Sequence, residues 1–206
     1  STGEERREWE LALVRKNEGF MDASQVQYVS RAGNFRKEGY RYTGALRILK
    51  VLLSYDYLWL NVRVKGGAYG CMSGFTRSGD GYFTSYRDPH LSRTNEVYEG
   101  IPAYLEQFTA EEKEMTKYII GTFSIVDAPL TPAAKTSRSA TAYLTGVTDE
   151  MLKRERAEIL NATGEDIRGL AGIVRAILKE NALCVIGNEE KLNQEKELFQ
   201  EIKNLY

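Results

Sequence analysis

Apolar and polar positions between Thr43 and Phe75 form the clearest pattern in the chain. Apolar residues recur at helical spacing as far as Val64, and the narrow polar remainder falls on one side at about 100° per residue. The apolar positions form two adjacent stripes, Leu46, Leu49, Leu53, Leu60 and Val64, and Ala45, Ile48, Leu52, Trp59 and Val62. The pattern predicts a long helix, buried around most of its circumference, with Thr43 as its N-cap.

Arg63 does not lie on the polar side of this predicted helix. That side consists of Arg47, Lys50, Ser54, Asn61 and Lys65. Arg63 projects roughly opposite, close to Trp59 and one heptad after Asp56. Gly66 and Gly67 follow, and glycine readily adopts the left-handed conformation that ends helices. We therefore expect an arginine at the C-terminal end of the helix, just before a tight turn.

A strand is predicted from Ala68 to Thr76. Its alternation gives two faces, with Gly70 and Gly74 on one and Tyr69, Cys71 and Phe75 on the other. Because glycine has no side chain, the first face would allow another backbone to come close.

Two interpretations of Arg63 and Tyr69 are open at this point. In the first, the arginine, the tight turn and the tyrosine together hold an extended peptide by its carbonyl groups. In the second, Arg63 pairs with Asp56 inside a packed interface and Tyr69 is an ordinary strand aromatic. A motif of this size supports a function only as a hypothesis.

Turn residues from Arg77 to Gly81 and an alternating run from Tyr82 to Arg87 predict a hairpin with the preceding strand. Its aromatic residues are Tyr82, Phe83 and Tyr86. They fit a set that faces a substrate, although cross-strand packing is the commoner role of strand aromatics.

Helical patterns dominate the second half of the chain. Helices are predicted at 94–108 with a bend at Gly100 to Pro102, and at 109–126, 131–144, 148–161 and 163–180. A capping box at Thr109 to Glu112 and the pair Thr131-Pro132 mark two of the starts. A short buried strand is expected at 182–186, followed by an amphipathic helical tail from Glu189 to Tyr206.

Residues 1–22 have the pattern of a connection, charge-rich up to Glu18, with a boundary at Gly19 to Ala23. The apolar anchors of this stretch would be Trp9, Leu11 and Val14. A strand from Gln25 to Arg31 and a polar loop at 33–42 lead into the long helix. We expect a single domain over residues 23–206 with an α+β fold, in which helices pack on one face of a mainly antiparallel sheet.

Composition excludes several classes of function. A net charge of −1 over 206 residues leaves no surplus for nucleic acid or an acidic membrane surface. No run approaches the roughly 18 apolar residues of a membrane span, and no signal sequence opens the chain. His90 is the only histidine, so no histidine-based zinc motif is present, and we expect it in a surface turn. Cys71 and Cys184 lie in apolar, strand-like stretches, which favours buried, reduced thiols over a disulfide.

Several stretches resemble the C-terminal part of presequence protease-type zinc metallopeptidases of the insulinase (pitrilysin) family. They are Val62–Gly70 (VRVKGGAYG), Ser85–Pro89 (SYRDP), Ser24–Val29 (SQVQYV), Val97–Gly100 (VYEG) and Thr145–Thr148 (TGVT). The resemblance covers most of the chain, and it implies the same α+β fold.

The resemblance also implies roles for particular residues. In that family, an arginine and a tyrosine of the last domain reach across a closed chamber to the peptide held at a zinc site in the first domain. The matching positions are Arg63 and Tyr69, which are therefore expected to be catalytic. Gly67, Ala68 and Tyr86 lie in the matching stretches and are expected to bind substrate.

The implied protein is a zinc metalloendopeptidase that degrades peptides, with this chain as its C-terminal, non-zinc-binding domain. Zinc would be bound by the N-terminal half of the same polypeptide, and this chain would contact that half and unfolded peptides. The isolated chain would be inactive, and the compartment would be bacterial cytoplasm or an organelle matrix. The alternative is a stand-alone, non-catalytic scaffold or peptide-binding subunit of the same fold. A reading frame that continues upstream to a zinc motif would distinguish the two.

Overall fold

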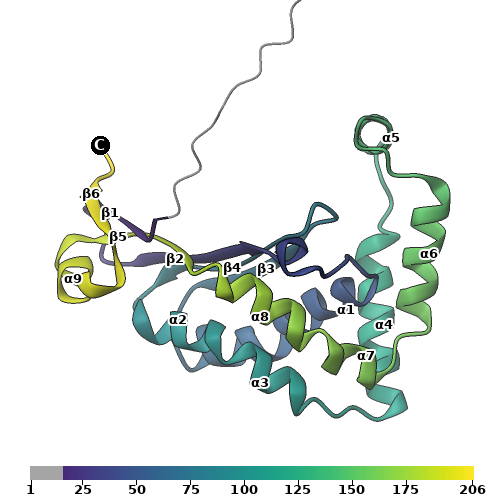
Figure 1. The fold of residues 1–206 in the computed structure, drawn as a ribbon, viewed down its shortest axis with the longest axis horizontal. Coiled ribbons are helices and arrows are strands. Elements are labelled where there is room, and N and C mark those ends of the chain that lie inside the picture. Colours follow the sequence, from purple (N-terminus) through teal and green to yellow (C-terminus); the bar gives the residue numbers. More distant parts are fainter. Residues whose placement is uncertain (1–15) are drawn as a thin grey trace, which may run out of the picture.

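A six-stranded sheet organises the described part of the chain, residues 16–206 of the computed structural model (Figure 1). The strands are β1 (Glu18–Asp22), β2 (Gln27–Asn34), β3 (Gly70–Phe75), β4 (Asp80–Asp88), β5 (Ala182–Asn188) and β6 (Glu201–Asn204). Their order is β3-β4-β2-β5-β1-β6. The pairs β3–β4, β4–β2 and β2–β5 are antiparallel, whereas β1 is parallel to β5 and β6. The predicted α+β fold is confirmed, and the sheet, antiparallel over most of its pairings, is mixed.

Helices cover one face of this sheet. They are α1 (Ala45–Leu52), α2 (Ser92–Glu99), α3 (Ile101–Glu106), α4 (Glu112–Val126), α5 (Pro132–Thr145), α6 (Asp149–Leu160), α7 (Gly164–Gly169), α8 (Ala171–Lys179) and α9 (Glu189–Gln194). In Figure 1, α1, α2, α3 and α8 lie below the sheet, while α4, α5 and α6 are grouped at one end and α9 at the other. No described helix covers the upper face of the sheet in this view.

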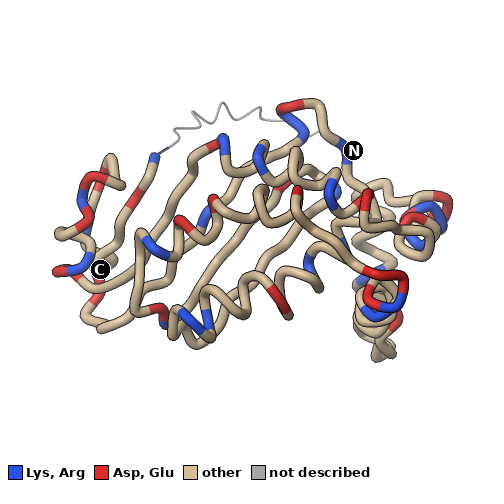
Figure 2. Tube along the Cα trace, turned by 90° about the horizontal axis from the view of Figure 1, so that it is seen from below, with Lys and Arg blue, Asp and Glu red and all other residues tan. Residues whose placement is uncertain are grey.

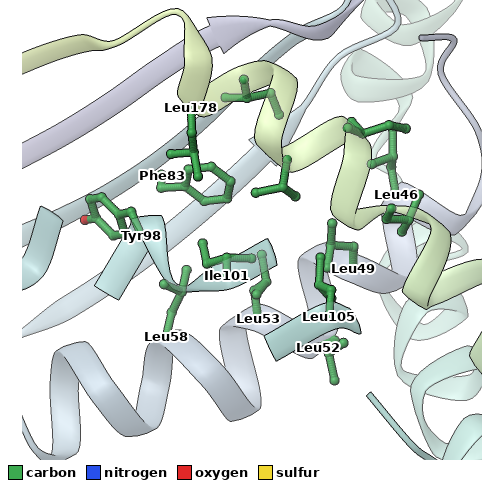
Figure 3. Close-up of a cluster of buried hydrophobic side chains, with 14 of the residues drawn as sticks. Leu46, Leu49, Leu52, Leu53, Leu58, Phe83, Tyr98, Ile101, Leu105 and Leu178 are labelled. Atoms are coloured by element: carbon green, nitrogen blue, oxygen red, sulfur yellow. The ribbon is translucent and has the colours of Figure 1, made fainter. Parts of the chain in front are cut away.

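The core lies between the sheet and the helices beneath it (Figure 3). The five apolar positions of α1 that the stripes predicted to be buried are buried, and Val51 is buried as well. They meet side chains from α2, α3, α8 and β4, among them Tyr98, Ile101, Leu105, Leu178 and Phe83. Tyr98 remains satisfied in this apolar setting because its hydroxyl donates to the carbonyl oxygen of Val29, 3.2 Å away. Each fully buried leucine stabilises the fold by about 1.5–3 kcal/mol.

The long predicted helix departs from α-helical geometry after Leu52. Two π-helical segments, Leu53–Tyr57 and Trp59–Val64, complete it. A π-turn bonds residue i to i+5 and so holds more residues per turn than the 3.6 used to count the stripes. The stripe consequently rotates out of the core, and the predicted burial of Trp59, Leu60 and Val64 is wrong because all three are exposed.

The start of that helix also differs by one residue from the prediction. Gly44 is the N-cap and Thr43 precedes it, although the Thr43 hydroxyl oxygen still accepts from the Ala45 amide at 3.3 Å. The Gly44 amide donates instead to a carboxylate oxygen of Glu158, 2.6 Å away on α6. A tertiary contact therefore replaces the local cap that the sequence suggested.

Both ends of the described chain enter the sheet. Residues Glu18–Asp22, predicted to belong to a connection and boundary, form β1 between β5 and β6. The predicted helical tail forms only the short α9, a single 3₁₀ turn at Lys196–Leu198, and then β6. Both departures depend on pairing between distant segments, which a local pattern does not reveal. The predicted anchors Trp9, Leu11 and Val14 lie outside the described residues.

Smaller predictions about the helices are confirmed or shifted. The break at Gly100 separates α2 from α3, and Thr131 and Thr148 cap α5 and α6. The capping box of α4 is formed by Glu111 and Glu114 and not by Thr109 and Glu112. The predicted helix 163–180 is divided at Leu170 into α7 and α8. Both cysteines are free, but Cys184 is exposed on β5, so its predicted burial is wrong.

We expect Gly33→Ala to lower the free energy of unfolding by about 1–3 kcal/mol, measured by urea denaturation. A Cβ at Gly33 would lie 2.1 Å from the Ile177 carbonyl oxygen, so β2 and α8 would have to separate. Gly169→Ala is the matched control, because Gly169 is an exposed helical glycine with no atom within 4 Å of an added Cβ. This control should be neutral or stabilise by roughly 0.5–1 kcal/mol. Unchanged stability of Gly33→Ala would contradict the close approach.

Candidate functional site

Arg63 lies in the second π-helical segment with its side chain exposed. Its guanidinium carbon is 4.1 Å from the centroid of the Trp59 ring, a cation–π contact worth about 0.5–1 kcal/mol at an exposed position. Asp56, its alternative partner, accepts instead from the hydroxyl of Tyr118 on α4. Within residues 16–206, Arg63 forms no ion pair with Asp56, and its side chain is exposed.

A tight turn joins the helix end to β3. The Gly67 amide donates to the Arg63 carbonyl oxygen at 2.8 Å, and the Ala68 amide donates to the Val62 carbonyl oxygen at 3.1 Å. Gly67 has a φ of +81°, which favours glycine, and a Cβ on Gly66 would lie 2.4 Å from the Val62 oxygen. The predicted glycine break is confirmed, and it fixes the direction of β3 relative to Arg63.

Tyr69 is the first large side chain after this turn, and 59% of its surface is exposed. Its ring lies 5.4 Å from the Tyr86 ring, centroid to centroid. The Tyr86 ring in turn covers Gly70, where an added Cβ would lie 2.3 Å from a ring carbon. Gly74 is covered in the same way by Tyr82. The predicted approach of another backbone at these glycines is therefore wrong, because tyrosine rings of β4 occupy the space.

Arg87 joins this group through an irregularity in β4. Gln27 pairs with Asp88 and Val29 pairs with Ser85, so Tyr28 alone faces two residues of β4, a β-bulge. Arg87 has a left-handed φ of +50°, which costs an ordinary residue about 1–2 kcal/mol. Its guanidinium carbon lies 5.7 Å from the centroid of the Tyr69 ring, and its carbonyl oxygen accepts from the Tyr69 amide at 3.2 Å.

The residues predicted to bind substrate lie together but differ in what they expose. Gly67 is exposed and Tyr86 half-buried, whereas the Ala68 side chain is buried in the core. The backbone amides of Gly67, Ala68 and Tyr69 all donate within the chain, as described above. These amides are therefore not available to a bound peptide. A peptide at this turn would be held by side chains, or by hydrogen bonds from its own N–H groups to carbonyl oxygens of the chain.

The site offers guanidinium and phenol groups and no metal ligands. No group of three or more histidine, cysteine, aspartate or glutamate side chains that could hold a metal occurs among residues 16–206. Burial raises the pKa of the Cys71 thiol to about 11, against the lowering effect of the Arg63 charge, so the thiol is protonated at neutral pH. His90 lies beside the Arg93 guanidinium, 3.3 Å from it, in the turn after β4.

Basic and acidic positions are not segregated along the described part of the chain. Figure 2 shows basic and acidic residues interspersed along the described chain, consistent with the sequence's net charge of −1. Within the described helices, none has the length and apolar character needed to span a bilayer.

Sequence reasoning placed Arg63 close to Trp59 but considered only Asp56 as its partner, and it gave Arg87, quoted within the Ser85–Pro89 stretch, no role. Strict alternation from Tyr82 places residues 83, 85 and 87 on the core face. Phe83 and Ser85 follow that pattern, but the bulge turns Arg87 outward and returns Asp88 to the core. The motif Arg87-Asp88-Pro89 was a usable signal, because an aspartate before a proline often ends a regular strand.

Comparisons with known proteins identify relatives over almost the whole chain. Residues 17–189 match the family model described as the PreP C-terminal domain. The chain is 47% identical over 201 residues to Protein HypA of Clostridium perfringens, covering 98% of this chain and 21% of that protein. It is 35% identical over 199 residues to the chloroplastic/mitochondrial Presequence protease 1 of Arabidopsis thaliana, covering 95% and 18%. The chain thus spans about a fifth of the length of these relatives.

The solved structure of pitrilysin shows the same fold with a TM-score of 0.60 at 14% sequence identity, covering 89% of this chain and 21% of that one. The fold, the matched model and the identity to full-length presequence proteases agree. The chain belongs to the family of presequence protease (PreP) C-terminal domains.

Proposed function

We propose that this chain serves as the non-zinc-binding C-terminal domain of a peptide-degrading zinc metalloendopeptidase, with Arg63 and Tyr69 contacting the reacting peptide. The observation that carries the proposal is the exposure of both polar groups around a turn whose amides are already bonded. A packed structural pair would bury these groups or pair Arg63 with a carboxylate. Zinc, held by the N-terminal half of the polypeptide, would activate the attacking water.

The two side chains suit the charge that develops when a peptide bond is attacked. Negative charge builds on the scissile carbonyl oxygen, and donors that are already positioned stabilise it without reorganisation. Tyr69 offers one directed hydroxyl donor. Arg63 stays charged at any working pH, and its guanidinium can donate several hydrogen bonds to carbonyl oxygens. We assign Tyr69 to the oxyanion and Arg63 to a neighbouring substrate carbonyl.

The substrates under this proposal are unfolded peptides that pass over Tyr69 and Tyr86. The bare face of the sheet would form part of the chamber wall opposite the zinc-binding half. We place the enzyme in bacterial cytoplasm or an organelle matrix. A stand-alone scaffold subunit is the second candidate, and it predicts that Arg63 and Tyr69 are dispensable for turnover.

We expect Tyr69→Phe and Arg63→Ala each to lower kcat of the full-length enzyme by at least about tenfold, since loss of one such donor typically costs about 10²–10³-fold. The melting temperature and zinc content should barely change, because both side chains are exposed. Steady-state kinetics on an unfolded peptide is the measurement. Tyr82→Phe is the matched control, because Tyr82 is also a partly exposed tyrosine packed over a glycine of β3. Full turnover in both site variants would favour the scaffold.

The isolated chain is expected to bind no stoichiometric zinc and to cleave no peptide. A hydrolytic zinc site needs three protein ligands, and the chain has one histidine. Elemental analysis of the purified chain, with a peptidase assay before and after chelation, measures both properties. One tightly held zinc per chain together with chelator-sensitive cleavage would overturn the proposal.

The helices at one end of the sheet are proposed to contact the rest of the polypeptide. None of the residues of α5 is buried, and Tyr143 and Leu144 near its end are 86% and 81% exposed. Ile120 and Ile125 of α4 add further exposed apolar surface. Large exposed apolar residues on a group of helices at one end of the domain are typical of an interface.

We expect the isolated chain to self-associate through this surface at high concentration. The double variant Tyr143→Ser, Leu144→Ser should shift sedimentation toward the monomer, because it removes the two most exposed apolar side chains of α5. Met72→Ser, on the bare face of the sheet, is the control. A strictly monomeric unaltered chain would count against the proposed interface.

A further inference from the structure

Arg87 is presented at the candidate site by backbone geometry and not by its place in a regular strand. The bulge puts both Tyr86 and Arg87 outside, between the core-facing Ser85 and Asp88. Bulges occur next to active sites, where they re-aim a side chain. A left-handed φ at a residue other than glycine or asparagine is sustained only when surrounding contacts enforce it. Here the amide of Tyr69 donates to the Arg87 carbonyl oxygen, which ties the bulge to the site.

The guanidinium of Arg87 has no acidic partner in the described part of the chain. Among the described residues, its side chain contacts the face of the Tyr69 ring. The neighbouring carboxylate of Asp88 is fully buried and faces away. It accepts from the Thr94 hydroxyl at 2.8 Å and from the His90 amide at 2.9 Å, so it is already satisfied. The positive charge of Arg87 is therefore uncompensated and exposed.

We infer that Arg87 is a specificity residue that binds a carboxylate of the peptide substrate beside Tyr69. This inference rests on the proposed function, because it takes the peptide to lie over Tyr69. A guanidinium presents parallel N–H donors that match the two oxygens of a carboxylate, whereas a backbone carbonyl offers a single oxygen. Packing against the Tyr69 ring restrains the orientation of the guanidinium before substrate binds. Peptides with a correctly spaced acidic side chain or a free C-terminal carboxylate are the favoured substrates.

The two sources of carboxylate are separated by the substrates used. A set of otherwise identical unfolded peptides carries a single Asp moved one position at a time along the sequence, each with an Asn counterpart. A second pair differs only in a free or amidated C-terminus. The full-length enzyme is assayed for KM and kcat with each peptide.

Arg87→Gly is the informative variant, because glycine adopts a φ of +50° without strain and the fold should be at least as stable. We expect it to raise KM at least about tenfold for one carboxylate peptide while leaving its Asn or amide counterpart within about twofold. Arg87→Lys keeps the positive charge but loses the paired N–H donors, so it should retain only part of the selectivity that Arg87→Gly loses. Lys65→Ala removes another exposed charge, at the end of the helix that carries Arg63, and should change all peptides alike.

Selective loss for an Asp position identifies a side-chain carboxylate, and selective loss for the free C-terminus identifies the terminal one. Equal effects on every carboxylate peptide and its neutral counterpart would overturn the inference. The readout differs from that of the proposed catalytic roles, which predict lower kcat for Tyr69→Phe with every peptide. If Tyr69→Phe has a normal kcat while Arg87 variants still lose selectivity, the catalytic role of Tyr69 is wrong and the specificity role of Arg87 stands.

Discussion

The turn at Gly66 and Gly67 is the constraint on which the candidate site depends. It converts the end of a wide π-helical segment into the start of an edge strand within a few residues, and two amides bonded back to Val62 and Arg63 hold it closed. The carbonyl oxygen of Val62 leaves no room for a Cβ at Gly66. The turn consequently fixes the backbone direction of Arg63 before it and of Tyr69 after it, while their side chains pack against Trp59 and Tyr86. Their polar groups remain free to meet a ligand.

The one-sided helical layer explains how such a site can face outward from a well-packed domain. Burial of α1, α2, α3 and α8 against the sheet supplies the core, so the other face is not needed for stability. That face carries tyrosines and small hydroxyl residues, including the Ser30 and Thr84 hydroxyls, which bond to each other at 2.7 Å. Glycines of β3 let tyrosine rings of β4 lie flat over the strand. The result is an aromatic surface next to the guanidinium group of Arg87.

Local patterns predicted the elements whose causes are local. The α1 stripe, the glycine break, the hairpin and the cap at Thr131 all follow from side chains within a few residues of one another. The π-turns, the bulge at Arg87 and the strands at the two ends depend on distant partners, so periodicity counted at 3.6 or 2 residues misplaced their side chains. The sequence pattern singled out Arg63 and Tyr69 but left two interpretations open, and only the family resemblance assigned them a role. Arg87 was missed because a single extra residue reverses the face of everything after it.

The position of β1 has a consequence for how the domain is assembled. It lies between β5 and β6, so strands separated by more than 150 residues must meet before the sheet is complete. Such long loops close slowly, and the corresponding part of the sheet is expected to form late in folding. A nascent chain would carry β1 as an unpaired strand until β5 and β6 had left the ribosome. During that interval its edges are open to wrong partners, and the isolated hairpin of β3 and β4 with the helical core would have to keep the chain soluble.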